Sequence, residues 1–296
     1  MEHWEPQIFT FLKTAVLALY KAFWGKKGYD LIVLEYGIDR PAEMDFLLSI
    51  NKPHIGVFTA IDAVHSEQFG NPTAIAQEEV KMIQNTREIA FLNRNDHYAK
   101  QLEGSLKGDV FWYQTEREPL ISDISFSAIH YSHDANLPVE LTLQIKQQHY
   151  TLQTNLLSNP NYAYLGVALT IAQILHLKYT ASELDMEKFV AGGFSFVLQP
   201  GRANLFAGKH ESILLDSTYN ASPLSMRKMI DTTLQLQKSL ADSRKIMLVL
   251  GDMRELGDLT ETEHRLLAAY VQQSADQVVL LGTSMHQYLA DELIKI

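Results

Sequence analysis

Short apolar runs alternate with helix-like segments along the first part of the chain. The apolar runs are rich in β-branched and aromatic residues and are bounded by turn-forming or polar residues, which is typical of buried strands. We predict such strands at residues 29–37, 54–61, 88–93 and 109–114. Helical signals occupy residues 40–50, 75–84 and 95–102. Alternating strands and helices predict a mostly parallel sheet with helices on its faces.

The pattern changes between residues 120 and 157, where apolar and polar residues alternate along the chain. A period of two predicts antiparallel strands. Two helices are expected next, at residues 162–177 and 181–192. From residue 211 onward strands and helices alternate again, and the last predicted helix runs to Ile296.

The apolar N-terminal segment, residues 8–24, suggests a signal peptide or a membrane segment at first sight. It follows acidic residues rather than basic ones, and Lys13 and Lys21 interrupt it. Its apolar residues recur at helical spacing, at Phe9, Leu12, Val16, Leu19 and Phe23. We therefore predict an amphipathic core helix and no membrane partner.

A glycine- and proline-containing stretch separates the two alternating regions. Gly192, Gly193, Pro200 and Gly201 predict a hinge there. We expect two domains, at residues 1–193 and 199–296. The predicted fold class is α/β: a mostly parallel central sheet with an antiparallel subregion, then a second, Rossmann-like α/β domain.

Composition narrows the function. The formal net charge of −10 argues against a broad surface that binds the phosphate backbone of a nucleic acid. A small anion-binding pocket is still compatible with this charge. The chain has no cysteine, which excludes disulfides, thiolate metal ligands and cysteine nucleophiles. A cytoplasmic location is compatible with this composition.

Polar residues stand at the predicted strand ends, where open parallel sheets bind ligands. A buried carboxylate such as Glu35 is costly unless it is paired or bound to a cation. For any single one of these residues a capped turn is the alternative, but several strand ends together favour a site. The candidates are Glu35, Thr59, Asp62, His65, Asp216, Ser217, Tyr219 and Asn220.

Four stretches together resemble the Mur ligase family: LIVLEYG, PHIGVFTAIDAVHSEQFGNPTAIA, GRANLFAGKHESILLDSTYNASPLSM and LVLGDMRELGDLTETEH. The runs DSTYNASPLSM and LGDMRELG resemble the branch that adds D-alanyl-D-alanine to UDP-N-acetylmuramoyl-tripeptide. The resemblance covers nearly the whole chain, as an ATPase-type central domain followed by most of a C-terminal domain.

The resemblance implies an ATP-dependent ligase of peptidoglycan precursor synthesis. ATP would phosphorylate a substrate carboxylate, and an amine would attack the acyl phosphate to form an amide. Magnesium would offset the charge of the phosphates. By resemblance, Glu35 and His65 are metal ligands, and Arg202 reaches the nucleotide phosphates. Asp216, Tyr219 and Asn220 would contact the nucleotide from the C-terminal domain.

Glu79 stands where the resemblance implies a lysine that is carbamylated to become an anionic ligand. Lys81 is two residues further along, about 200° round the helix, so it points elsewhere. Glu79 already has a carboxylate, and we interpret it as a direct, shorter replacement. The alternative is that the function is lost and Glu79 is a solvated helix residue.

Other positions depart from the family pattern. Ala60 stands where the family has Asn, and Asn161 matches a nucleotide-side motif in which Tyr164 replaces another Asn. The chain contains no G-x-x-x-x-G-K-[ST] phosphate loop. We therefore expect a piece of a longer ligase without its UDP-binding domain, with a truncated C-terminal domain, and inactive alone; a separate chain carrying the loop is an alternative.

Two other function classes stay open. A non-catalytic binding or scaffold descendant would keep the fold without turnover. Other branches, such as folylpolyglutamate or cyanophycin synthesis, share the chemistry, but the STYNASPLSM and GDMRELG runs argue against them.

Overall fold

The computed structural model describes residues 13–14, 16–17, 20, 25, 28–64, 66–117, 121–131, 139–240 and 244–294. Its contacts divide the chain into two compact units, residues 1–37 and residues 38–296.

The first unit departs from the sequence prediction. Residues 13, 14, 16, 17 and 20 are helical as expected, but Val16 and Leu17 are exposed rather than part of a core. The predicted buried strand at 29–37 is wrong, because residues 31–36 belong to no described sheet and Val33 is 87% exposed. A β-rich run becomes a strand only where another strand pairs with it, and none of the described strands does so here.

The second unit begins with a six-stranded sheet in the order β1-β2-β3-β4-β5-β6. Strands β1 (Ile55–Phe58), β2 (Ile89–Asn93) and β3 (Asp109–Tyr113) are parallel. β3 meets β4 in parallel at a single pair, Tyr113 and Ile124. β4 (Ile124–Tyr131), β5 (Val139–Ile145) and β6 (Gln148–Thr154) are antiparallel. This confirms the predicted mixed sheet.

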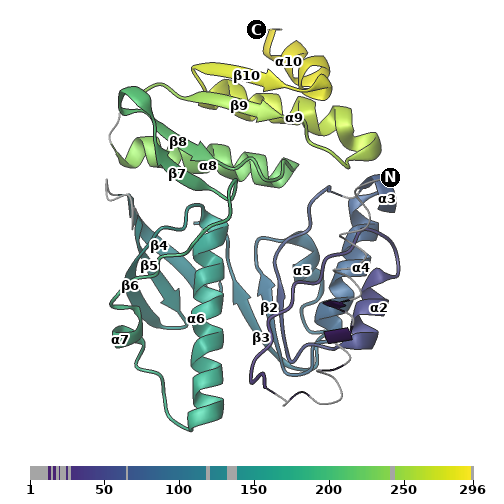
Figure 1. Ribbon diagram of the computed structural model, residues 1–296, viewed down its shortest axis with the longest axis vertical. Helices are drawn as coiled ribbons and strands as arrows, with labels where there is room; N and C mark the ends of the chain where they lie inside the picture. The colour runs from purple at the N-terminus through teal and green to yellow at the C-terminus, as the bar shows by residue number, and fades with distance from the viewer. Residues whose placement is uncertain are drawn as a thin grey trace. The chain divides into compact units, whose positions relative to one another are not determined.

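Helices connect and cover the strands of this sheet. α2 (Glu43–Ile50), α3 (Ser66–Phe69), α4 (Pro72–Gln84) and α5 (His97–Gln101) belong to its parallel part. α4 begins at Pro72, three residues before the predicted start, because the Asn71 side chain accepts a hydrogen bond from the Ala74 N–H and Pro72 follows. α6 (Asn159–Thr180) packs on β4 and β5, and α7 (Met186–Val190) on β6 (Figure 1).

The C-terminal part contains two small sheets. β7 (Asn204–Ala207) and β8 (Ile213–Asp216) form an antiparallel pair, with the short helix η1 (Lys209–Glu211) between them. β9 (Met247–Gly251) and β10 (Gln277–Leu281) are parallel. α8 (Pro223–Ser239), η2 (Gly257–Leu259), α9 (Thr260–Ser274), the π-helical turn η3 (Met285–Leu289) and α10 (Ala290–Ile294) complete this part. β7 was not expected from the sequence.

Hydrophobic clusters link the two parts of the second unit. The largest cluster contains β4–β6 and α6 residues, and Leu236 of α8 is buried in it. The C-terminal cluster in turn includes Ala63, from the loop after β1. Because apolar side chains cross the predicted 193–199 boundary, residues 38–296 behave as one compact unit. No helix in the described ranges is long and apolar enough to cross a membrane.

Candidate active site

The carboxyl ends of the parallel strands collect acidic and aromatic residues. Glu79 lies on α4 and is half-buried, and Asp96 follows β2. Burial and then the negative charge of Asp96 raise the pKa of Glu79 to about 7. Burial and the charge of Asp96 destabilise the charged form of this carboxyl group, and a positive charge beside it would stabilise that form. The position therefore suits a cation.

Asp96 is held by the backbone around it. Its Oδ1 accepts a hydrogen bond from the Ala99 N–H at 2.8 Å, which caps α5, and its Oδ2 accepts one from the Ile61 N–H at 3.0 Å. Asp96 therefore ties the end of β2 to the loop after β1. Both oxygens already have donors, so its negative charge acts on neighbouring groups from a fixed place.

Tyr113 lies at the end of β3, at the same edge of the sheet. Its hydroxyl donates to the carbonyl of Phe58 at 2.6 Å, and the Asn93 amide donates to the carbonyl of Thr59 at 2.8 Å. These bonds fix the peptide at the end of β1, where the sequence predicts part of the site. They also satisfy buried polar groups that would otherwise be costly.

Tyr164 faces the same edge from α6. Its ring lies edge-on to that of Tyr113, with centroids 6.0 Å apart, and burial together with the charge of Asp96 raises its pKa to about 12. Asn161 turns inward instead: its amide nitrogen donates to the Leu157 carbonyl at 2.6 Å. The structure thus brings Tyr164, Asp96 and Glu79 to one region, whereas Asn161 serves the start of its own helix.

Ser158 precedes α6 in an unusual backbone conformation, with φ 85° and ψ 144°. This region is adopted almost only by glycine, and strained residues of this kind cluster at functional sites. No sequence signal marked Ser158. Ser158 directly precedes the first turn of α6, which contains Asn159 and Asn161.

The C-terminal candidates gather at the β7–β8 pair. The Arg202 guanidinium stacks over the Tyr219 ring, 3.7 Å from its centroid. Gly201 makes this possible: its φ is 76°, its carbonyl accepts from the Tyr219 N–H at 3.2 Å, and a Cβ there would lie 2.5 Å from the Tyr219 nitrogen. Arg202 is exposed, so its charge is available to an anion.

Asp216 ends β8 opposite Asn204, which brings it beside the start of β7. Its Oδ1 accepts hydrogen bonds from the Thr218 N–H at 3.1 Å and the Thr218 hydroxyl at 2.7 Å. Asn220 is exposed in the turn that follows. The four C-terminal candidates, Arg202, Asp216, Tyr219 and Asn220, therefore share one end of this sheet.

Two predicted metal ligands are not placed against the rest. His65 lies outside the described residues. Glu35 is exposed and belongs to residues 1–37, so the metal-ligand roles that the resemblance implies for Glu35 and His65 stay predictions. Within the described ranges, no group of three or more His, Cys, Asp or Glu side chains is arranged to hold a metal ion.

Lys81 is engaged elsewhere, as the helix geometry predicts. Its ammonium pairs with Asp45 at 2.6 Å and with Glu78 at 2.8 Å. Glu78 also accepts a hydrogen bond from the Met44 N–H at 3.1 Å, so this group anchors α2 on α4. Of the charged residues on this stretch of α4, Glu79 is the one near Asp96.

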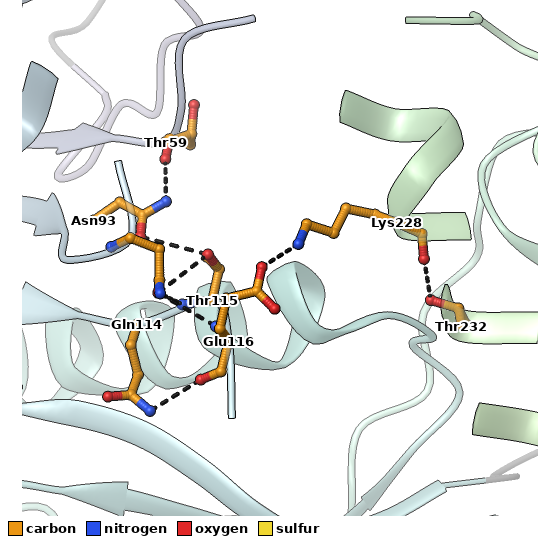
Figure 2. A network of polar contacts seen from close by, with 8 residues as sticks. Thr59, Asn93, Gln114, Thr115, Glu116, Lys228 and Thr232 are labelled. Carbon is orange, nitrogen blue, oxygen red and sulfur yellow. Dashed lines mark hydrogen bonds and ion pairs between the residues drawn. The ribbon is translucent and has the colours of Figure 1, made fainter. Parts of the chain in front are cut away.

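A polar network that the sequence did not reveal runs across the strand ends (Figure 2). The Asn95 side-chain oxygen accepts hydrogen bonds from the Thr115 N–H at 2.7 Å and the Glu116 N–H at 3.3 Å. The Glu116 carboxylate then pairs with Lys228 of α8. Only the folded structure reveals this ion pair, because 112 residues separate Glu116 from Lys228 in the sequence.

The arrangement combines two sets of groups with different chemistry. The middle set offers an acidic edge that can take a cation, beside aromatic rings. The C-terminal set offers an exposed guanidinium on an aromatic ring, next to Asp216 and Asn220. Such groups suit a nucleotide: arginine binds phosphate, aromatic rings stack on bases, and acidic oxygens bind magnesium.

Comparison with known families matches both parts of the chain. Residues 5–189 match the Mur ligase middle domain, and residues 201–295 match the Mur ligase, glutamate ligase domain. The UDP-N-acetylmuramoyl-tripeptide–D-alanyl-D-alanine ligase of Bacillus subtilis is 27% identical over 271 residues, which are 90% of this chain and 54% of that protein. The Escherichia coli ligase of the same name is 24% identical, over 87% of this chain and 54% of its own.

Solved structures share the fold. The crystal structure of MurF from Acinetobacter baumannii superposes with a TM-score of 0.71 at 21% identity, covering 90% of this chain and 55% of that one. MurF ligase from Thermotoga maritima, solved in complex with ADP, gives a TM-score of 0.65 at 17% identity, covering 91% and 69%.

The chain spans about half the length of the curated relatives it matches. Its two parts follow one another in the order of the two matched domains, and together these matches cover most of the 296 residues. The mixed sheet and the second α/β region agree with that assignment. This chain belongs to the Mur ligase family of ATP-dependent amide ligases.

Proposed function

We propose that this chain provides the ATP-binding and C-terminal parts of a ligase that adds D-alanyl-D-alanine to UDP-N-acetylmuramoyl-tripeptide. The observation that carries the proposal is the match to both Mur ligase domains, joined to curated relatives that bear this name. Peptidoglycan precursor synthesis would then be its role and the cytoplasm its location.

The proposed roles follow the chemistry of each group. Glu79, with Glu35 and His65, would hold a magnesium ion, which neutralises phosphate charge when it is bound. The raised pKa of Glu79 supports this, because a carboxyl group beside Asp96 is relieved by a cation. Glu79 would thereby replace the carbamylated lysine of the family without requiring carbon dioxide.

The nucleotide would lie between the two sets of residues. Arg202 would leave its place over Tyr219 to bind phosphate oxygens, and the freed Tyr219 ring would be open to the nucleotide. Asp216 and Asn220 would contact the nucleotide from the same side, and Tyr164, beside Asn161, from α6. Phosphoryl transfer to the tripeptide carboxylate would give an acyl phosphate, which the dipeptide amine attacks with release of phosphate.

A non-catalytic descendant of the family is the second candidate. The observation that favours it is the absence of a G-x-x-x-x-G-K-[ST] loop from the 296 residues. Backbone N–H groups of such a loop cradle the phosphates, and positioning supplies most of the catalysis in phosphoryl transfer. We therefore propose that ATP-dependent amide formation requires a phosphate loop, which the 296 residues do not contain.

The test is amide formation and phosphate release with ATP, magnesium, UDP-muramoyl-tripeptide and D-alanyl-D-alanine. The 296-residue chain should give no substrate-dependent release by itself. The chain fused to a phosphate-loop segment, or supplied with one in trans, should form the amide, and His65→Ala should abolish it. A folded, loop-bearing chain that binds ATP yet forms no amide would favour the scaffold candidate. Robust release by the chain alone that is lost in His65→Ala would overturn the need for an added loop.

A further inference from the structure

Helix α8 contacts the middle part of the chain at its first turn. Asp62, in the loop after β1, directs Oδ2 at the Leu224 N–H, 3.2 Å away, while its Oδ1 accepts from the Ala63 N–H at 2.8 Å. The N–H groups of a first helical turn have no partner within the helix and carry a partial positive charge. The carboxylate of Asp62 therefore caps a helix that begins 161 residues later in the chain, at Pro223.

A second contact lies one turn further along α8. Lys228 pairs with Glu116, which follows β3, and Arg117 donates to the Gln235 side chain at 3.4 Å. Asp231 stands beside the same pair: burial raises its pKa, and Lys228 offsets that effect. Lys228 is thus the positive charge between carboxylates of both parts of the chain.

Glu116 is itself held by the network in Figure 2. Its N–H donates to Asn95, its carbonyl accepts from the Gln114 amide at 2.9 Å, and Asn93 joins the neighbouring Thr115 hydroxyl at 3.4 Å. Asn93 also donates to Thr59 at the end of β1. A continuous set of hydrogen bonds therefore connects the carboxyl ends of β1, β2 and β3 to Lys228.

The first turn of α8 is held by its own capping interactions. Ser222 and Ser225 form a capping box, and Pro223 occupies the first turn. The segment from Asp216, at the end of β8, through Tyr219 and Asn220 leads directly into this helix. Any shift of α8 thus moves those residues relative to Glu79 and Asp96.

We propose that Asp62, Glu116 and Lys228 are positioning residues that clamp α8 at two points. The clamp sets the nucleotide-side residues of the C-terminal part against the carboxyl ends of β1–β3 before any nucleotide binds. This inference rests on the proposed function for its consequence, but the clamp itself is a property of the fold. Two points one turn apart restrict rotation of α8 as well as translation, which a single contact cannot do.

The size of the effect follows from the exposure of the ion pair. The Lys228 and Glu116 side chains are 24% and 31% exposed, so solvent weakens their attraction. Loss of such a pair should lower the ratio of clamped to unclamped molecules about two- to fivefold. Charge reversal at Lys228 should lower it further, because Glu116 and Asp231 would then face a third carboxylate.

The chain has no cysteine, so two spin labels can be placed without further changes. Labels at Lys100→Cys on α5 and Gln273→Cys on α9, both exposed, report the distance between the two parts by pulsed electron resonance. The labelled chain should give one narrow distribution without nucleotide. Lys228→Glu, Glu116→Lys and Asp62→Ala should each broaden it, and Glu116→Lys combined with Lys228→Glu should restore it.

Lys178→Glu is the matched control, because Lys178 pairs with Glu88 at 2.8 Å within the middle part of the chain. It should leave the distribution narrow. A purely structural role for Lys228 would show as loss of folding that the double reversal does not repair. Unchanged distributions in the single variants, or a double reversal as broad as the singles, would overturn the clamp. Binding of magnesium–ADP, measured separately on the same samples, tests the nucleotide site of the proposed function without affecting this result.

Discussion

Glu79 is the residue at which the fold most clearly disturbs an ionisation that the function can use. The pKa of its carboxyl group is near 7 in the folded chain and 4.5 in a model peptide. Between these values the folded protein retains a proton that the unfolded chain has lost. The stability present below pH 4.5 is therefore lost as the pH rises to 7, and the loss then stays constant.

Replacement of Glu79 by Gln should remove this loss. The variant should match wild type near pH 4 and exceed it at pH 8 by on the order of 3 kcal/mol in free energy of unfolding. Urea unfolding at both pH values measures the difference. Magnesium at pH 8 should stabilise wild type more than Glu79→Gln, because only wild type has a carboxylate at position 79.

Glu187→Gln, at an exposed position of α7, is the control for this measurement and should leave the profile as in wild type. A parallel decline of wild type and Glu79→Gln between pH 4.5 and 7 would show that Glu79 is an ordinary solvated residue. That outcome corresponds to the alternative drawn from the sequence.

The direction in which a side chain points was predictable from the sequence where the local helix geometry determines it. The opposite directions of Glu79 and Lys81 follow from helix rotation alone, and the contacts of Lys81 with Asp45 and Glu78 agree. The stacking of Arg202 on Tyr219 and the approach of Asp96 to Glu79 require the chain to fold back over long separations. No local pattern contains that information.

At the scale of elements, hydrophobic periodicity predicted the longer helices and most strands from β1 onward, but not the four-residue helix α3. It failed for residues 29–37, where Leu31, Ile32 and Val33 are exposed. Apolar periodicity records what a segment can bury and not whether a partner strand is present. Strand β7 was missed because its four residues, NLFA, are too short to show a period.

The loop between β9 and α9 depends on a buried histidine. His264 is 0% exposed; its Nδ1 donates to the Thr260 carbonyl at 2.7 Å and its Nε2 accepts from the Met253 N–H at 3.2 Å. His264→Leu should leave the Met253 N–H buried without a partner and lower the free energy of unfolding by about 1–3 kcal/mol. Chemical denaturation measures this loss.

His264→Gln is the companion variant, since its side-chain amide can still accept from Met253. It should recover a large part of the stability lost in His264→Leu. Equal stability of His264→Leu and wild type would mean that the loop between β9 and α9 is held by its packing, chiefly the buried Met253 and Leu256 side chains.

At the scale of the molecule, the fold class and the order of its α/β regions were predictable, and the mixed sheet confirms them. The degree to which the parts merge was not. Ala63 packs in the C-terminal cluster and Leu236 in the central one, so residues 38–296 form one unit. Packing across a hinge depends on side-chain shape at long sequence separation, which periodicity does not record.

The central claim is that the two sets of strand-end residues form a magnesium–nucleotide site. Isothermal titration of the 296-residue chain with ADP tests it most directly. We expect saturable heat that requires magnesium, and about tenfold or greater weakening by Arg202→Ala, because charge-assisted bonds to phosphate contribute about 1.5–3 kcal/mol. Arg265→Ala, which removes a guanidinium paired with Glu261 and Glu292, should bind as wild type. Absence of saturable binding by the folded chain, or equal affinity of Arg202→Ala and wild type, would contradict the account.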